Sequence, residues 1–97
     1  MIIYVDIDNT ICKTNGTDYE NAEPYTSKID KINKLYDDGH QIVYWTARGS
    51  GSGIDRTELT LNQLKAWGCK YHQMRLWKPA YDVFIDDKSF SDIDNFC

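Results

Sequence analysis

Apolar runs rich in β-forming residues alternate along the chain with segments of helical periodicity, and this alternation constrains the fold more than any other sequence feature. The runs cover residues 2–7, 41–46 and 81–85, with a weaker run at 70–76. Helical patterns lie between residues 25 and 39 and between residues 55 and 68. Nearly continuous apolar strands that alternate with helices favour an α/β domain with a parallel sheet covered on both faces.

Each helical pattern has a recognisable face and end. In the first, apolar residues repeat at spacings of four, three and four, and Gly39 can adopt the left-handed conformation that ends a helix. The second is capped by Asp55 and stopped by Gly68. The residues expected to face inward are Tyr25, Ile29, Ile32 and Tyr36 in the first helix, and Thr57, Leu61, Leu64 and Trp67 in the second.

The composition suits one domain spanning residues 1–97, because 97 residues with 41% hydrophobic content lie near the size at which a single core becomes self-sufficient. A formal charge of -4 argues against a general nucleic-acid binder, which needs a basic face. Three cysteines without a C-x-x-C spacing indicate reduced thiols rather than a disulfide framework. With no apolar stretch long enough for a signal peptide or a membrane helix, we expect a cytoplasmic protein that has no membrane partner.

Polar side chains gather where the predicted strands end. Ligands of parallel α/β sheets bind at the carboxyl ends of the strands, so these residues are expected to share one edge of the sheet, which we call the rim. They are Asp6 and Asp8 after the first strand, Thr46, Ala47 and Arg48 after the second, Lys78 just before the last strand, and Asp86 and Asp87 after it.

Asp6 and Asp8 place two like charges at the end of a buried strand. Their repulsion is tolerable only if a cation, protons or hydrogen bonds offset it. Magnesium fits this role, because it prefers a few carboxylates together with water and phosphate oxygens. Taken alone, each grouping also has a plain structural interpretation: Asp8 begins a turn or caps a helix, Thr46 is an ordinary strand residue, Lys78 is a solvated charge, and the late acidic pair starts a turn.

Taken in order, Asp6-x-Asp8-x-Thr10, Thr46, Lys78 and Asp86-Asp87 resemble the four sequence motifs of the haloacid dehalogenase (HAD) superfamily of phosphohydrolases. The resemblance spans about 82 of the 97 residues, from position 6 to position 87. It implies a Rossmann-like three-layer sandwich with a small, mostly parallel sheet of about four strands, in the order 3-2-1-4.

The resemblance also implies a role for each motif residue. Asp6 would be the nucleophile that forms an aspartyl-phosphate, and Asp8 would protonate the leaving oxygen and then activate water. Thr46 would hydrogen-bond a phosphoryl oxygen, while Lys78 would hold Asp6 and neutralise charge on the transferred group. The implied magnesium ligands are Asp6, Asp8 through its backbone carbonyl, Asp86 and, close by, Asp87.

Two assignments stay open at this point. Ile85 precedes the acidic pair where the family often has a small residue, so either Asp86 or Asp87 could contact the metal directly. Arg48 could bind substrate together with Ala47, or it could lie on the surface.

The intervals between the motifs leave no room for a cap domain. Residues 11–27 can form a small β-hairpin flap, since Asn15-Gly16 is a strong hairpin signal, and residues 49–77 hold one helix and one strand. A capless site is open, so it can accept a bulky phosphorylated molecule or borrow walls from a second subunit of a homo-oligomer. The Gly/Ser loop at residues 49–53 is either a flexible linker or a phosphate-binding backbone.

We therefore expect a magnesium-dependent phosphomonoester hydrolase whose small-molecule substrate is a sugar phosphate or a nucleotide. One alternative is a polynucleotide-end phosphatase, which the acidic balance disfavours; another is a catalytically silent module that binds metal or phosphate. A receiver-type signalling domain ranks below both, because no Asp follows the second strand before Asp55. The main expectation depends on acidic side chains from the two ends of the chain meeting around one ion near Lys78.

Overall fold

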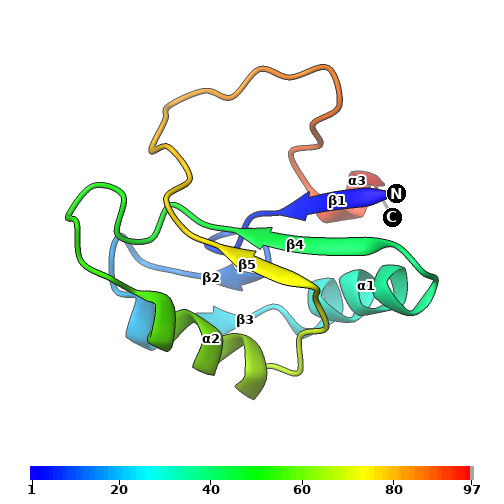
Figure 1. The fold of residues 1–97 in the computed structure, drawn as a ribbon, viewed down its shortest axis with the longest axis horizontal. Helices are drawn as coiled ribbons and strands as arrows, with labels where there is room; N and C mark the ends of the chain where they lie inside the picture. The colour runs from blue at the N-terminus through cyan, green and yellow to red at the C-terminus, as the bar shows by residue number, and fades with distance from the viewer. Residues whose placement is uncertain (97) are drawn as a thin grey trace.

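The computed structural model describes residues 1–96, which form a small α/β structure (Figure 1). In chain order the elements are β1 (Ile2–Val5), β2 (Cys12–Lys13), the 3-10 helix η1 (Tyr19–Asn21), β3 (Glu23–Pro24), α1 (Thr26–Asp37), β4 (Gln41–Trp45), α2 (Thr57–Ala66), β5 (Gln73–Arg75) and α3 (Ile93–Phe96). Within residues 1–96, no helix combines the length and the apolar content that crossing a bilayer requires.

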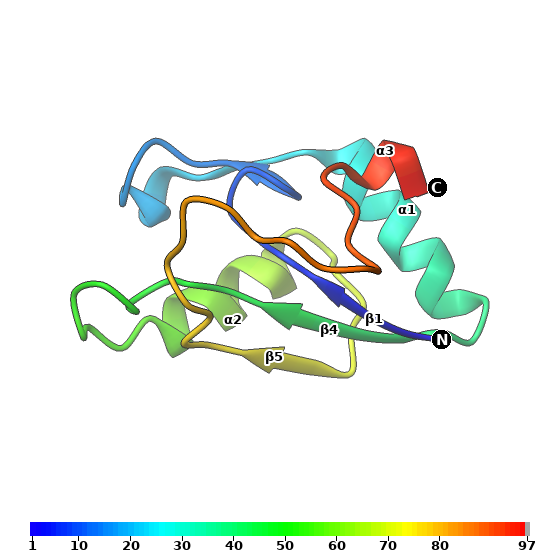
Figure 2. The ribbon, with the colours of Figure 1, turned by 90° about the horizontal axis from the view of Figure 1, so that it is seen from above.

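The main sheet holds its strands in the order β1-β4-β5, and both pairings are parallel. Ile2 pairs with Gln41 at the start of β1, and Val43 pairs with Gln73 at the start of β5. Figure 2 shows the three arrowheads at the same end of the sheet. This arrangement confirms the predicted order of the first three strands and the existence of a common rim at their carboxyl ends.

The predicted fourth strand is wrong for the part of the chain that the structure describes. Residues 81–85 form no strand, and all of residues 79–91, which we call the arm, are exposed. Figure 1 shows the arm rising away from the sheet after β5 and returning to α3. Because residues 81–85 do not pair with β1, one side of β1 has no neighbouring strand, and β1 is an edge strand of the main sheet.

Helices α1 and α2 lie on the same face of the sheet (Figure 1), so the predicted helical cover of both faces is absent from residues 1–96. Ile42 and Tyr44 of β4 point toward the helices and are fully buried. On the opposite, helix-free face, Ile2 and Tyr4 of β1 are 67% and 49% exposed. The buried core consists of Val5, Ile7, Ile11, Cys12, Ile29, Ile32, Ile42, Tyr44, Leu64 and Ile93.

Both long helices end as the sequence predicts. Gly39 follows α1 with a φ of +97° and Gly68 follows α2 with a φ of +71°, a region that glycine enters without steric cost. At the start of α2, the Thr57 N–H donates a hydrogen bond to the Asp55 carboxylate at 2.9 Å. Asp55 thus accepts a hydrogen bond from the first residue of α2, as a capping side chain does, but the N-cap position itself is Arg56, one residue later than predicted.

The predicted inward position of Leu61 is wrong. Leu61 is 38% exposed, whereas Thr60 is fully buried and its hydroxyl accepts a hydrogen bond from the Arg48 guanidinium at 3.3 Å. A polar side chain is stable at a buried helix position when its hydrogen bond is made. The inward face of α2 is therefore partly polar, which apolar periodicity does not reveal.

The predicted flap is present as the antiparallel pair β2-β3, in which Cys12 pairs with Pro24. Its connection is longer than a two-residue turn, since residues 14–22 lie between the strands and contain η1. Asn15-Gly16 begins this connection: Gly16 has a φ of +56°, and the Asp18 N–H donates to the Asn15 carbonyl oxygen at 3.0 Å. The Asn15-Gly16 pair therefore predicted the position of the flap correctly, but it did not predict the length of the connection between the two strands.

Candidate active site

Asp6 follows β1 directly, which places its side chain at the rim. One carboxylate oxygen lies 3.7 Å from the Lys78 ammonium, and the other accepts a hydrogen bond from the Thr10 hydroxyl at 3.3 Å. Partial burial raises the pKa of Asp6 above its ordinary value, while the charge of Lys78 and the hydrogen bond from the Ile7 N–H oppose the increase. The rim thus holds a partly buried carboxylate that is paired with a cation.

Lys78 reaches Asp6 because the chain changes direction just before it. Trp77 has a φ of +63°, which is uncommon for a bulky side chain, and the Lys78 N–H then donates to the Thr46 carbonyl oxygen at 3.0 Å. The ammonium lies 5.9 Å from the ring centre of Trp45 and 5.3 Å from that of Tyr81. The Lys78 side chain is 14% exposed, so it is not a freely solvated charge.

Asp8 forms a two-pronged ion pair with Arg48. The guanidinium donates from Nη2 to Oδ1 at 2.9 Å and from Nε to Oδ2 at 3.0 Å. The Thr14 hydroxyl donates to the same carboxylate at 2.6 Å. Because Arg48 is only 1% exposed, the two groups hold each other in a fixed geometry with little competition from water. The surface interpretation of Arg48 is therefore wrong.

Arg48 also connects the rim to the flap and to α2. Its Nη1 donates to Gln63 at 2.5 Å, and its guanidinium carbon lies 4.9 Å from the ring centre of Tyr19 in η1. Gln63 in turn donates to the Tyr19 carbonyl oxygen at 2.6 Å. Sequence reasoning did not identify Gln63 or Thr60 as part of this network, because neither belongs to a local motif and both reach Arg48 only through the tertiary fold.

Thr46 and Ala47, two of the residues that the sequence predicts to bind substrate, directly follow β4. Thr46 is fully buried, and its hydroxyl accepts a hydrogen bond from the Arg48 N–H at 3.1 Å. The Ala47 carbonyl oxygen accepts from the Ser50 N–H at 2.9 Å, which closes the turn. The predicted substrate-binding residues after β4 therefore form a tight turn at the rim.

The Gly/Ser loop is anchored to the site at its first residues. Gly49 has a φ of +83°, and a Cβ added there would overlap the Ile54 carbonyl oxygen. The Gly53 N–H donates to the Gly49 carbonyl oxygen at 2.8 Å, and the Ser50 hydroxyl donates to the Lys78 carbonyl oxygen at 2.7 Å. The loop therefore links β4 to the residue that pairs with Asp6.

Asp86 and Asp87 lie on the exposed arm, apart from this arrangement. The Asp86 carboxylate accepts a hydrogen bond from the Lys88 N–H at 2.8 Å, which forms a local turn. Within residues 1–96, no group of three or more His, Cys, Asp or Glu side chains lies close enough together to hold a metal ion. A single copy of the chain therefore brings Asp6 and Asp8 to the rim and leaves the late acidic pair on the arm.

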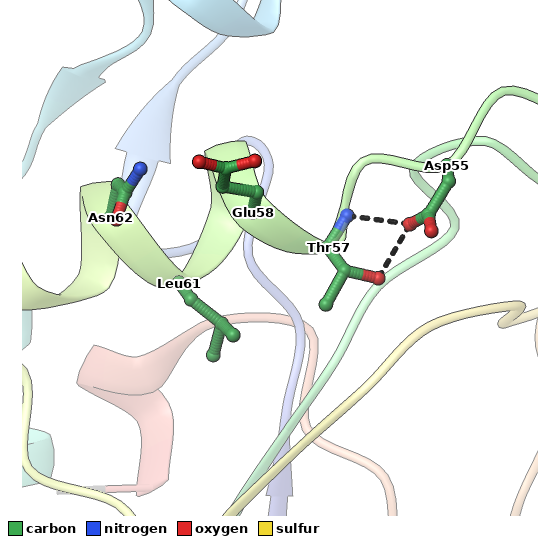
Figure 3. Close-up of a pocket in the computed structure, with 5 residues that line it drawn as sticks. All are labelled: Asp55, Thr57, Glu58, Leu61 and Asn62. Carbon is green, nitrogen blue, oxygen red and sulfur yellow. Dashed lines mark hydrogen bonds between the residues drawn. The ribbon is translucent and has the colours of Figure 1, made fainter.

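A shallow pocket of about 380 Å³ lies elsewhere, along the start of α2, as Figure 3 shows. Asp55, Thr57, Glu58, Leu61 and Asn62 line it. The Thr57 hydroxyl donates to the Asp55 carboxylate at 2.5 Å, so these two polar groups satisfy each other. None of the residues predicted to bind substrate or metal lines this pocket.

Comparisons with other proteins bear on the fold. Neither a protein-family model nor a curated protein sequence matches the chain. The crystal structure of a structural-genomics target from Vibrio cholerae is similar, with a TM-score of 0.86 and 24% sequence identity over 98% of this chain and 85% of that one. At this level of identity the likeness shows a shared fold, and the chain adopts a small α/β fold with a mostly parallel sheet.

Proposed function

We propose that the protein is a magnesium-dependent phosphomonoester hydrolase that acts through an aspartyl-phosphate on Asp6. The observation that supports this most is the pairing of Asp6 with Lys78 at the rim. Attack on a phosphate brings two anions together, and an ammonium 3.7 Å from the carboxylate offsets part of that repulsion. Thr46, which follows β4 at the same rim, has a hydroxyl that can donate a hydrogen bond to a phosphoryl oxygen.

The residues divide the reaction into two transfers. In the first, a carboxylate oxygen of Asp6 bonds to phosphorus, the bond from phosphorus to the leaving oxygen breaks, and a protonated Asp8 gives its proton to that oxygen. In the second, Asp8 takes a proton from water, the water oxygen bonds to phosphorus, and Asp6 and inorganic phosphate separate. Arg48 and Thr14 hold Asp8 as a hydrogen-bond acceptor, which is the form that the second transfer uses. The proton that Asp8 takes from water in the second transfer is the one that it gives to the leaving oxygen of the next substrate.

A small phosphorylated molecule is the substrate class we propose, with sugar phosphates and nucleotides as the first to test. The formal charge of -4 supports a small substrate over a polynucleotide, since a phosphate backbone is bound through a basic face. The two-stranded flap is too small to act as a lid domain, which supports a site accessible to molecules of varied size.

Release of phosphate from a generic aryl phosphate tests the proposal. We expect turnover with magnesium, none with a chelator, and a loss of at least about 1,000-fold in Asp6→Asn, since that change removes the nucleophile. Asp30→Asn, which alters an exposed carboxylate of α1, is the matched control and should keep full activity. A wild-type protein that releases no phosphate from the aryl substrate or from a panel of phosphorylated metabolites would overturn the proposal.

A further inference from the structure

The arm carries a strand-like apolar segment that the fold leaves in water. Val83, Phe84 and Ile85 are 73%, 50% and 92% exposed, and all three are residues that favour strands. Contiguous apolar side chains of this size are costly to leave exposed and mark surfaces that bind another protein. The segment therefore has the composition of a strand without a sheet to join.

The body of the protein offers a matching surface. β1 is an edge strand of the main sheet, so one side of its backbone is available for pairing among the described residues. Ile2 and Tyr4 of the same strand are exposed on the helix-free face. A parallel strand added beside β1 would cover this edge and would carry the acidic pair that follows it to the rim, next to Asp6.

The chain is too short to add that strand to its own sheet. Lys78 is fixed at the rim by its contacts with Thr46 and Asp6, and Asp86 follows it by eight residue steps. A parallel strand matching the four residues of β1 would require a descent of about 13 Å to the amino end and a return of about 13 Å. The path also crosses two strand spacings, about 10 Å, from β4 to the free side of β1, whereas eight extended steps span at most about 29 Å.

An antiparallel strand from the same chain avoids this limit but fails for another reason. The arm would run from the rim to the amino end of β1, so the acidic pair would finish at the opposite end of the sheet from Asp6. Neither arrangement within one chain completes a site that contains both Lys78 and the acidic pair.

We propose that two copies of the chain exchange their arms around a two-fold axis, so that residues 82–85 of each copy form a parallel strand on β1 of the other. The two sheets then run in opposite directions, with the two exchanged strands between the two β1 edges. The rim of one copy lies beside the amino end of the other. Lys78 is held beside Thr46 at the end of β4, so the exchanged strand lies three strand spacings away, about 14 Å, and the four steps from Lys78 to Asp82 span about this distance.

The anchors of the arm agree with such an exchange. One end is held by Lys78 at the rim, and the other by α3, where Ile93 is buried in the core and Asp92 and Asp94 form ion pairs with Lys28 and Lys31 at 3.3 and 2.6 Å. Each copy keeps both anchors, and only the arm between them crosses. The consequence for chemistry, which rests on the proposed function, is that each site takes Asp6 and Lys78 from one copy and the acidic pair from the other.

The mass in solution tests the exchange independently of any activity. We expect the wild-type chain to be a dimer by light scattering and Ile85→Lys to be a monomer, since a charge would then lie inside the added strand. Leu61→Lys, which changes an exposed apolar residue of α2, is the matched control and should stay dimeric. A monomeric wild-type chain, or an Ile85→Lys dimer as tight as wild type, would overturn the proposal.

Complementation between two inactive variants tests the shared site. Asp6→Asn and the double variant Asp86→Asn/Asp87→Asn each damage one half of it. When the two are co-expressed in equal amounts, half of the dimers are mixed and each mixed dimer holds one intact site, so about a quarter of wild-type activity should return. Absence of any recovery, with mixed dimers present, would refute the exchange. If the wild-type protein has no phosphatase activity, the proposed function fails while the mass measurement still decides the exchange.

Discussion

Replacing Arg48 with alanine removes the partner that fixes Asp8 and leaves that carboxylate partly buried without compensation. Arg48 is fully buried and contacts the flap and α2 as well. Breaking such a pair from one side costs about 3 kcal/mol, because the remaining charge keeps its desolvation penalty. We expect the free energy of unfolding, measured by urea denaturation, to fall by about this amount.

Arg75→Ala is the control for this change, since Arg75 is exposed and its Nε hydrogen-bonds the neighbouring Gln73 of the same strand. A surface substitution of this kind changes stability by less than about 0.5 kcal/mol. Equal losses in Arg48→Ala and Arg75→Ala would show that the buried ion pair contributes nothing to the fold.

The carboxylate of Asp92 links protonation to the anchoring of α3. It accepts hydrogen bonds from the Asp94 N–H at 3.1 Å and from Lys28 at 3.3 Å, and these lower the pKa of Asp92 below its ordinary value of 3.8. A lowered folded-state pKa stabilises the fold above the unfolded-state pKa, and this contribution disappears as the pH falls through the folded-state pKa.

We expect Lys28→Ala to raise the pKa of Asp92 only partway toward 3.8, because the backbone hydrogen bond from Asp94 is the larger cause and stays in place. An NMR titration of the Asp92 carboxyl carbon in both proteins measures this directly. A wild-type pKa at or above 3.8 would mean that Asp92 does not anchor α3 electrostatically.

The loop between β4 and α2 depends on its first glycine and not on its middle one. Gly49→Ala combines a left-handed φ of +83° with an overlap between the new Cβ and the Ile54 carbonyl oxygen, so we expect a loss of about 2 kcal/mol or more. A Cβ at Gly51 meets nothing within 4 Å, so Gly51→Ala should be close to neutral. Thermal unfolding of the two variants distinguishes an anchored loop from a flexible linker, which would tolerate both changes equally.

The elements that the sequence predicts well are those determined by local patterns. The first two strands and both long helices follow from apolar periodicity, an Asp cap and two glycine stops, all of which act within a few residues. The inward face of α2 does not follow from such patterns, because Thr60 is buried for its hydrogen bond to Arg48, twelve residues away. A residue's burial there depends on a tertiary partner that periodicity does not reveal.

The candidate site likewise contains residues that local patterns predict and residues that depend on tertiary contacts. Asp6, Asp8, Thr46 and Lys78 reach the rim because parallel strands deliver their ends to one edge, which strand order alone predicts. The ion pair between Asp8 and Arg48 was not predicted. The sequence left open whether Arg48 binds substrate or lies on the surface, and its burial depends on its contacts with the flap and α2. The acidic pair did not join them in a single copy, because residues 81–85 have the composition of a strand but no available sheet edge within reach.

Magnesium should stabilise the exchanged dimer and not the separated chains. Only the dimer would place the acidic pair beside Asp6, and a cation that binds the folded assembly raises its melting temperature by mass action. We expect a rise of several degrees in wild type on addition of millimolar magnesium and none in Ile85→Lys, measured by differential scanning fluorimetry. Equal increases of the melting temperature in both proteins would mean that magnesium binds away from the shared site.

The buried guanidinium of Arg48 has a consequence for local opening of the structure. Its contacts join the end of β1, the flap and α2, and its own amide hydrogen is bound to Thr46. Exchange of that amide with deuterium therefore requires most of the molecule to open, whereas amides of the arm in a lone chain exchange by small fluctuations. The position of Asp8 and the cooperativity of unfolding therefore depend on the same side chain, while the arm can move without disturbing either.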